Sequence, residues 1–469
     1  MSKTVAVLGA SYGGAHAAKL LAQGLPAGWK VVVVDRNTHM NHLYVLPRYA
    51  VVSGHEYKAF IPYGPLLRGA TASKPDASVV FLHANVTSLS PRSITLSRAF
   101  PEHGVDDTTH TLRFDYAVYA LGSHLPAPID LWGPVGDEQD VAALTVGADH
   151  ESTADKANAS HSSSNPLERA AITRGTKPEG IEWLKRFRRR VEKASSVLVV
   201  GGGALGVQYA TDIAEVYPHK RVTLLHSRKQ LMPRFSERLH SEIVSSLSEL
   251  KITTILGDRL DLSSIKAGKT TQGPDGKEER VVRTLSGHEI SAELILLCTG
   301  QNLNTDLVAQ AIPDAVIPDG SKKGLIRVKR TMQVAVPSNP AAPDMPVDSA
   351  KGSGDEHLHV PHPHLFAIGD AADAFGAMNS GRSSYFQLIN RSEILRTHGK
   401  AEGQADSSSD DLEQYTPGPP MIKITLGLTK QLYEVDGEVG TKMDGTPDLE
   451  AHRMWEFYGV ETDGDKMYE

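Results

Sequence analysis

Residues 197–206 read VLVVGGGALG, a short apolar run followed by a glycine-rich turn, and the amphipathic stretch GVQYATDIAEVY continues from Gly206. The turn has the spacing G-x-G-x-x-G between a predicted strand and a predicted helix, which is the context in which this motif binds a dinucleotide. In such a turn Gly201 makes the tight bend, Gly203 lets the backbone approach a pyrophosphate, and Gly206 lets the helix pack on the strand. The strand RVTLLHS at residues 221–227 completes a β-α-β unit.

A second copy of this arrangement opens the chain. The strand TVAVL, the turn GASYGG at residues 9–14, an Ala- and Leu-rich helix and the strand VVVVD follow one another over residues 4–35. The stretch from Gly9 to Gly13 fits the G-x-S-x-G elbow of serine hydrolases, with Ser11 as nucleophile, but the whole turn also fits the dinucleotide motif with serine in the middle position. Both motifs join a strand to a helix, so the turn alone does not decide between them.

The strand after this turn ends in Asp35, where a dinucleotide-binding unit carries the acid that binds the adenosine ribose. A hydrolase elbow requires neither this acid nor Gly14. The unbroken copy at Gly201 supports the same interpretation, so we interpret Ser11 as a substitution within a phosphate-binding turn that has no catalytic role. The predicted contacts of this first site are Gly9, Ala10, Ser11, Tyr12, Gly13, Gly14 and Asp35.

The second unit differs at the equivalent strand end, where the sequence is His226-Ser227-Arg228. An acid at this position would bind the ribose 2′-hydroxyl of NAD, and without one there is no carboxylate to repel a 2′-phosphate. We therefore expect NADPH, or both nicotinamide cofactors, to bind here, with Arg228 as the phosphate contact. The predicted contacts of the second site are Gly201, Gly203, Gly206, His226 and Arg228.

The composition excludes several classes of protein. The chain has 469 residues, of which 40% are hydrophobic and 22% charged, enough for two or three globular domains. A formal net charge of -7 argues against nucleic acid as a partner. The single cysteine, Cys298, excludes an intrachain disulfide and fits a reducing compartment. Without a bilayer-spanning apolar run or room for a signal peptide before the first strand, a cytoplasmic protein is expected.

Five segments occur in order along the chain: VAVLGASYGG, HLYVLPRYAVVSGHEYKAFIPY, VVGGGALGVQYATDIAEVYPHKRVTLLHS, ELILLCTG and LFAIGDAADAF. Together they resemble the pyridine-nucleotide flavoprotein oxidoreductases, specifically the apoptosis-inducing-factor-like branch that includes ferroptosis suppressor protein and its fungal relatives. The resemblance covers most of residues 3–435. It implies FAD and NAD(P)H as cofactors, hydride transfer from NAD(P)H to the flavin, and a second electron acceptor, for which a quinone is favoured.

The resemblance also implies particular contacts. The first glycine motif would bind FAD, Arg48 would contact this cofactor, and Val86 would reach its adenine side through the backbone. Asp370 in AIGDAAD would hydrogen-bond the ribityl chain. Gln208 stands where many relatives have a glutamate near the nicotinamide ribose, so an altered nicotinamide contact is expected. Relatives that reduce disulfides carry a cysteine pair beside the flavin, and a chain with one cysteine is not expected to do so.

The predicted fold class is α/β, with two Rossmann-like dinucleotide-binding domains of the three-layer ββα type and a small C-terminal α+β domain. Strand ends at Gly122 and Gly300 mark where the chain would cross between the large domains, and both are predicted cofactor contacts. The expected domains are residues 1–125 with 301–400 for FAD, 126–300 for NAD(P)H, and 415–469 at the C-terminus. Disordered insertions are expected at residues 147–165, 336–363 and 401–413 from their polar, Pro- and Gly-rich composition.

Three further features receive structural interpretations. The arginine-rich helix predicted over residues 180–194 is interpreted as a solvated face. The four histidines of HLHVPHPH, residues 357–364, do not share a helix face, so no metal site is expected. The segment RMWEFYGVE is expected to pack against the flavin domain, with peripheral membrane contact left open.

The sequence therefore favours an FAD-dependent NAD(P)H oxidoreductase whose residues mainly bind and position cofactors, with no side chain as nucleophile or general base. Two alternatives remain open: a flavoenzyme that acts on a specialised metabolite, and a redox-sensing or death-signalling flavoprotein with slow turnover. The oligomeric state is not predicted.

Overall fold

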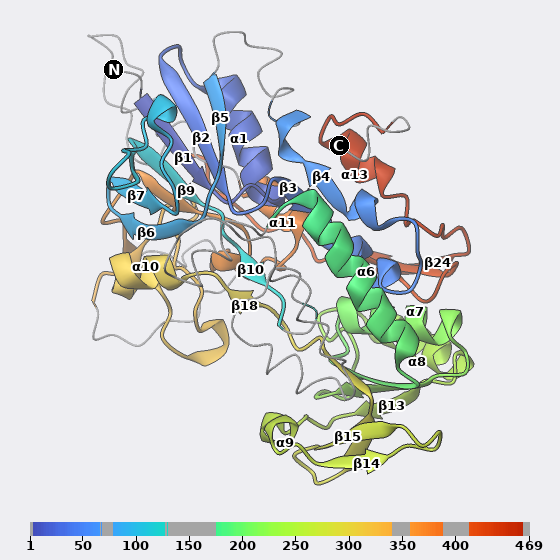
Figure 1. Cartoon of the computed structure of the whole chain (residues 1–469). Coiled ribbons are helices and arrows are strands. Elements are labelled where there is room, and N and C mark those ends of the chain that lie inside the picture. Colours follow the sequence, from blue (N-terminus) through green and yellow to red (C-terminus); the bar gives the residue numbers. More distant parts are fainter. Residues whose placement is uncertain are drawn as a thin grey trace.

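The computed structural model describes most of the chain, namely residues 3–65, 67, 78–126, 129, 175–339, 357–387 and 412–462. Two parallel sheets form its centre (Figure 1). In spatial order the first sheet consists of β21 (Leu365–Ala367), β9 (Tyr116–Tyr119), β1 (Lys3–Leu8), β2 (Trp29–Asp35) and β5 (Ser78–His83). The second consists of β13 (Thr253–Leu256), β12 (Arg221–His226), β11 (Ser196–Val200) and β17 (Leu294–Leu297). Every pairing in them is parallel, which confirms the predicted α/β class.

Each parallel sheet is the middle of three layers. In the second unit, Val197 and Val199 point into a core shared with helices α7 (Ala204–Val216) and α8 (Glu237–Glu249). Leu198 and Val200 point to the opposite face, because side chains alternate along a strand. That face is covered by the antiparallel strands β14 (Thr270–Gln272), β15 (Glu278–Arg283) and β16 (Glu289–Ala292). The first unit has the same parts: α1 (Tyr12–Gly24) and the antiparallel strands β6 (Val86–Ser90), β7 (Ser93–Leu96) and β8 (Thr111–Arg113).

The chain leaves the first unit and returns to it along a short two-stranded ladder. Strand β10 (Ser123–His124) pairs antiparallel with β18 (Asn302–Leu303), directly after the strand ends at Gly122 and Gly300. Both glycines have positive φ, at 57° and 122°. The ladder lies where the sequence predicted the chain to cross between its two large domains, and helix α10 (Asp306–Ala311) follows the return.

A third, smaller unit follows, with strands β22 (Ile422–Thr425), β23 (Gln431–Val435) and β24 (Glu438–Lys442) and helix α13 (His452–Phe457). Its sheet lies against α7 and α8, and α13 turns back onto the first unit (Figure 1). Trp455 on α13 is fully buried, and its indole nitrogen donates to the carbonyl of Lys58 at 2.9 Å. The predicted packing of RMWEFYGVE against the flavin domain is therefore confirmed.

Shorter elements connect these units: β3 (His39–Asn41), the 3-10 helix Leu43–Val45, α2 (Leu46–Tyr49), the 3-10 helix η2 (Glu56–Ala59), β4 (Phe60–Pro62) and α11 (Gly381–Phe386). The arginine-rich segment forms helix α6 (Lys177–Lys193). Leu184, Phe187 and Val191 make its buried stripe, whereas Arg186 and Arg189 are exposed. This agrees with the predicted solvated face.

The expected insertions are only partly within the described residues. Residues 147–165 lie outside them, and of 401–413 only the last two residues are described. The ends of 336–363 differ from the expected disorder, because β19 (Val336–Pro337) pairs antiparallel with β20 (Leu358–His359). Composition could not indicate this ladder, since its two strands are short and its pairing depends on distant residues.

Candidate cofactor sites

The two glycine turns are built in the same way. Gly9 and Gly201 have φ of 92° and 120°, in the region that favours glycine. A Cβ on Gly9 would lie 2.4 Å from the carbonyl oxygen of Ala120, and one on Gly201 would lie 2.1 Å from that of Cys298. In each unit the glycine therefore lets the turn press against the end of the neighbouring parallel strand, so no other residue fits there without a shift of backbone.

The last glycines of the two turns also have matching surroundings. A Cβ on Gly14 would lie 1.9 Å from the carbonyl oxygen of the first glycine of its turn, and one on Gly206 would lie at the same 1.9 Å. The middle positions differ. Ser11 is the N-cap residue of α1 and has φ of -71°, a conformation open to any residue, so serine is accommodated without strain. At Gly203 a Cβ would meet nothing within 4 Å, so the protein itself does not require glycine there.

Strand-end side chains brace both turns. The Asp35 carboxylate accepts from the backbone N–H of Ala10 at 2.7 Å and from that of Asn37 at 2.7 Å. Nδ1 of His226 accepts from the backbone N–H of Gly202 at 3.0 Å. Burial raises the pKa of Asp35 and lowers that of His226, although backbone hydrogen bonds oppose the shift in both cases. His226 thus takes the structural place of the acid as a neutral side chain.

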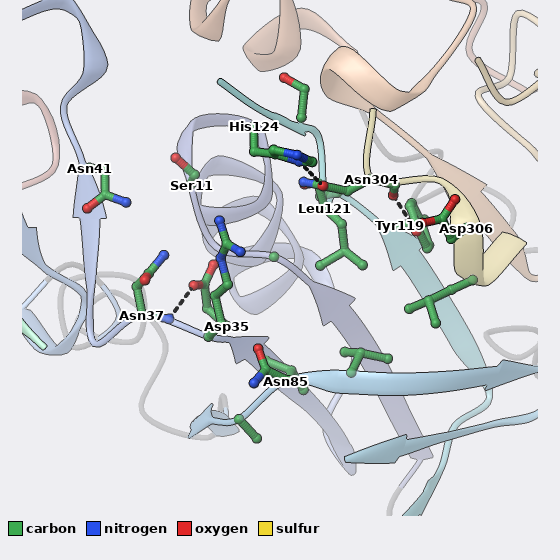
Figure 2. Close-up of a pocket in the computed structure, with 18 of the residues that line it drawn as sticks. Ser11, Asp35, Asn37, Asn41, Asn85, Tyr119, Leu121, His124, Asn304 and Asp306 are labelled. Carbon is green, nitrogen blue, oxygen red and sulfur yellow. Dashed lines mark hydrogen bonds between the residues drawn. The ribbon is translucent and has the colours of Figure 1, made fainter. Parts of the chain in front are cut away.

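A cavity of about 360 Å³ lies in front of the first turn (Figure 2). It is lined by residues from the glycine turn, the ends of the parallel strands, β6 and the β10–β18 crossing. Among the predicted contacts, Gly9, Ser11, Asp35 and Val86 line it directly. Asn37, Asn41 and Asn85 add polar groups at the ends of β2, β3 and β5 (Figure 2).

The return crossing supplies a wall of the cavity that sequence reasoning missed. The amide of Asn304 donates to the carbonyl of Leu121 at 2.8 Å, and its side-chain oxygen lies 2.7 Å from Nδ1 of His124. The hydroxyl of Tyr119 donates to the backbone carbonyl of Asn304 at 2.5 Å. Figure 2 shows these groups together at one side of the cavity. The only sequence signal was their position next to the two strand ends.

Asp370 lies beside the same wall. It sits in the 3-10 turn Gly369–Ala371 after β21, and its carboxylate accepts from the hydroxyl of Ser123, a cavity residue, at 2.7 Å. Burial raises the pKa of Asp370, whereas the Ser123 hydrogen bond lowers it. This position is compatible with the predicted contact to a ribityl chain, which remains a prediction.

Arg48 and Gln208 lie elsewhere. Arg48 is completely buried and does not line the cavity; its guanidinium pairs with Asp212 on α7. The predicted FAD contact of Arg48 is therefore not supported by its placement. The amide nitrogen of Gln208 donates to the hydroxyl of Thr425 on β22 at 3.3 Å, so this side chain faces the C-terminal unit. Arg228, by contrast, is exposed just beyond β12, as a phosphate contact requires.

Two parallel sheets with matching glycine turns define a protein that binds two dinucleotides. The chain belongs to the pyridine nucleotide-disulphide oxidoreductase family, whose pattern matches residues 3–342. Fe-regulated protein 8 of Mycosarcoma maydis is 36% identical over 467 residues, which cover 98% of this chain and 96% of that protein. Apoptosis-inducing factor homolog B of Dictyostelium discoideum is 22% identical over 456 residues, covering 94% and 93%.

Among solved structures, NDH2 from Plasmodium falciparum in complex with NADH is similar in fold, with a TM-score of 0.60 and 10% identity over 100% of this chain and 96% of that one. These matches confirm the apoptosis-inducing-factor-like branch, with a fungal member among its relatives. The protein is an FAD-dependent NAD(P)H oxidoreductase. The sequence contains one cysteine, Cys298, so an intrachain dithiol cannot form. Within the described ranges, no helix is both long and apolar enough to cross a bilayer.

The residues present fit these cofactors. The cavity at the first turn is lined by Ser11 and Asp35, and Asp35 still has lone pairs for ribose hydroxyls after accepting two backbone hydrogen bonds. At the second turn the open space over Gly203 faces the N-terminus of α7, which favours an anionic pyrophosphate. When bound, the flavin and nicotinamide supply the redox chemistry, so the chain's task is to hold and orient them.

Proposed function

We propose that this oxidoreductase passes electrons from NADPH, in preference to NADH, to a quinone. A quinone is proposed as the electron acceptor because a cluster of aromatic rings lies beside the first glycine turn. We call it the aromatic cluster, and its members are Tyr12, Tyr44, Tyr385, Phe457 and Tyr458. A flat, apolar acceptor such as a quinone is the kind of molecule that stacks on such rings.

The aromatic cluster connects the turn to the surface. Tyr12 belongs to the turn, and its ring lies 5.8 Å from that of Tyr44 and 6.4 Å from that of Tyr385. Phe457 lies 5.3 Å from Tyr385 and is 52% exposed, and Tyr44 is 48% exposed. Burial raises the pKa of Tyr12 and of Tyr44, and the nearby Asp370 carboxylate adds to both shifts. These rings therefore lie close to the predicted ribityl contact.

The preference for NADPH rests on the end of β12. His226 replaces the ribose-binding acid, and Arg228 is exposed two residues further along. Asp258, whose backbone N–H donates to the carbonyl of His226 at 3.2 Å, is hydrogen-bonded through its carboxylate to the side chains of Ser286 and His288. A 2′-phosphate bound at this strand end would meet the Arg228 guanidinium, and the ribose-binding acid is replaced by His226.

Anaerobic reduction of the FAD-loaded protein by NADPH, followed by steady-state oxidation with a soluble quinone, tests the proposal. We expect rapid quinone-dependent turnover, and we expect Phe457→Ala and Tyr44→Ala to raise KM for the quinone about tenfold, the loss of one ring contact of about 1.4 kcal/mol, with little effect on KM for NADPH. Leu285→Ala is the matched control, because Leu285 is 68% exposed but lies on the second unit.

Other outcomes assign other functions. Turnover only with a different organic acceptor would support a flavoenzyme of specialised metabolism. Retained FAD with no turnover by any acceptor would support a redox-sensing role. If KM for the quinone is the same in the ring variants and in the control, the aromatic cluster does not bind the acceptor.

A further inference from the structure

All five N–H groups of the buried Arg48 guanidinium have a partner. Nε and Nη2 donate to the two carboxylate oxygens of Asp212, each at 3.1 Å. Nη2 also donates to the carbonyl of Gly427 at 2.7 Å. Nη1 donates to the carbonyls of Thr446 at 3.0 Å and Leu428 at 3.4 Å. Because a guanidinium has five donors, none is left for a further ligand.

These partners come from three parts of the fold. Arg48 lies on α2, in the segment that leads from β3 to β4 of the first unit. Asp212 lies on α7 of the second unit. Gly427 and Leu428 form the turn between β22 and β23, and Thr446 follows β24, all in the C-terminal unit. One side chain therefore joins the FAD-binding unit, the NAD(P)H-binding unit and the C-terminal unit.

One face of α7 receives this junction. Gln208, Asp212 and Glu215 lie three or four positions apart, so they share a side of the helix. Gln208 binds Thr425, and Glu215 accepts from the backbone N–H of Leu428 at 2.7 Å. The turn between β22 and β23 is thus held along the whole face, and α7 is the helix that starts at the second glycine turn.

The charges make this junction sensitive to its geometry. The side chains of Arg48 and Asp212 are both fully buried, and a buried charge is tolerated only when its partner and hydrogen bonds are in place. Sliding of α7 along α2 would leave both charges unpaired. The junction therefore selects one orientation of the two cofactor-binding units.

We propose that Arg48 is a positioning residue: by tying α7 and the β22–β23 turn to the first unit, it fixes the nicotinamide-binding unit against the flavin-binding unit. This role concerns reduction of the flavin by NAD(P)H and does not depend on which acceptor follows. It also replaces the FAD contact that the resemblance implied for Arg48.

The test uses Arg48→Lys and Asp212→Asn in the full-length, FAD-loaded protein. We expect the rate of anaerobic flavin reduction by NADPH to fall at least tenfold while FAD content stays at the wild-type level. In hydrogen exchange, amides of residues 425–430 should exchange at least tenfold faster, with no change in β1 and β2. Arg188→Lys is the matched control, because Arg188 pairs with Glu56 at 3.4 Å between α6 and η2, and this ion pair includes neither Asp212 nor the β22–β23 turn.

Two results would overturn the proposal: a reduction rate within twofold of wild type in variants that retain FAD, or a weaker FAD affinity with normal reduction of the loaded fraction, which would restore a direct FAD contact. If both variants fail to fold, Glu215→Ala replaces them in the test. This substitution removes the acceptor of the Leu428 N–H without leaving a buried charge. The same limits on the flavin reduction rate and on FAD affinity apply to it. A wild-type protein that NADPH does not reduce would instead disprove the NADPH-dependent activity itself.

Discussion

Asp35 and His226 occupy equivalent places in the two nucleotide-binding units: each ends a strand and accepts a hydrogen bond from the backbone N–H that follows the first glycine of its turn. The hydrogen bond has been kept while the chemical group has changed from a carboxylate to an imidazole. A substitution at this position can therefore change the cofactor preference while it keeps the hydrogen bond that supports the turn.

His226→Asp should shift the cofactor preference toward NADH. A carboxylate can still brace the Gly202 N–H, but it would bind a ribose 2′-hydroxyl and repel a 2′-phosphate. We expect the ratio of kcat/KM for NADPH to that for NADH to fall about tenfold or more, equivalent to roughly 1.4 kcal/mol. Arg228→Ala should lower kcat/KM for NADPH alone. Unchanged selectivity in that variant would exclude Arg228 as the phosphate contact.

Alanine at Gly203 and at Gly206 should act on different properties. A Cβ at Gly203 meets no protein atom within 4 Å, so Gly203→Ala should keep its stability and FAD content and raise KM for NAD(P)H. A Cβ at Gly206 would lie 1.9 Å from a backbone oxygen, so Gly206→Ala should lower the unfolding free energy by a few kcal/mol, about 1–3 as for overpacked sites. Thermal unfolding and KM measured on both variants check this, and a stable Gly206→Ala protein would contradict it.

Ser11→Gly should leave FAD binding and turnover nearly unchanged. Ser11 adopts φ of -71° and its side chain makes no capping hydrogen bond to α1, so its removal changes neither the turn nor the helix start. FAD titration and steady-state turnover are the measurements. Loss of activity in a variant that still holds FAD would restore a chemical role for the hydroxyl.

Acid should destabilise the protein partly through His42 and His39. Burial lowers the pKa of His42 to about 4 and that of His39 to about 3, whereas the unfolded chain titrates near 6.5. Between these values the unfolded state binds protons that the folded state excludes, so the stability present above pH 6.5 is lost as the pH falls. For His42 the loss is roughly 3 kcal/mol.

Urea unfolding of wild type and His42→Gln at about pH 7.5 and about pH 5 measures this effect. Asp35 and Asp370, whose pKa values are raised by burial, act in the opposite direction, so the comparison between the two proteins isolates His42. The variant should lose less stability on acidification than wild type. Equal losses would show that His42 does not titrate as described.

The glycine turns could be predicted from sequence because their requirements are local. Gly9 and Gly14 meet backbone atoms of their own turn and of the next strand in the sheet, and Asp35 follows at a spacing set by one helix and one strand. Such requirements produce a recognisable pattern within a short stretch of sequence. The packing of the segment around Trp455 could also be predicted, because its acidic residues argue against a membrane anchor.

The wall of the cavity and the role of Arg48 could not be predicted in this way. Asn304 and Leu121 are 183 positions apart in the sequence, and Arg48 and Asp212 are 164 positions apart. Neither periodicity nor a short motif can indicate contacts between residues so distant in the sequence. The one local signal was a charged residue inside the otherwise apolar segment LPRYAVV. The family resemblance implied that Arg48 contacts FAD, whereas in the structure its guanidinium binds Asp212 and backbone carbonyls of the C-terminal unit.

The spread of the Arg48 partners along the chain has a consequence for biosynthesis. Arg48 and Thr446 are 398 positions apart, which at ribosomal speed separates their appearance by roughly 20 to 80 s. During this interval the guanidinium has no C-terminal carbonyls to bind, and water must solvate it. The full set of Arg48 hydrogen bonds can therefore form only late in translation, and the first sheet is likewise completed only after β21 (Leu365–Ala367) has been synthesised.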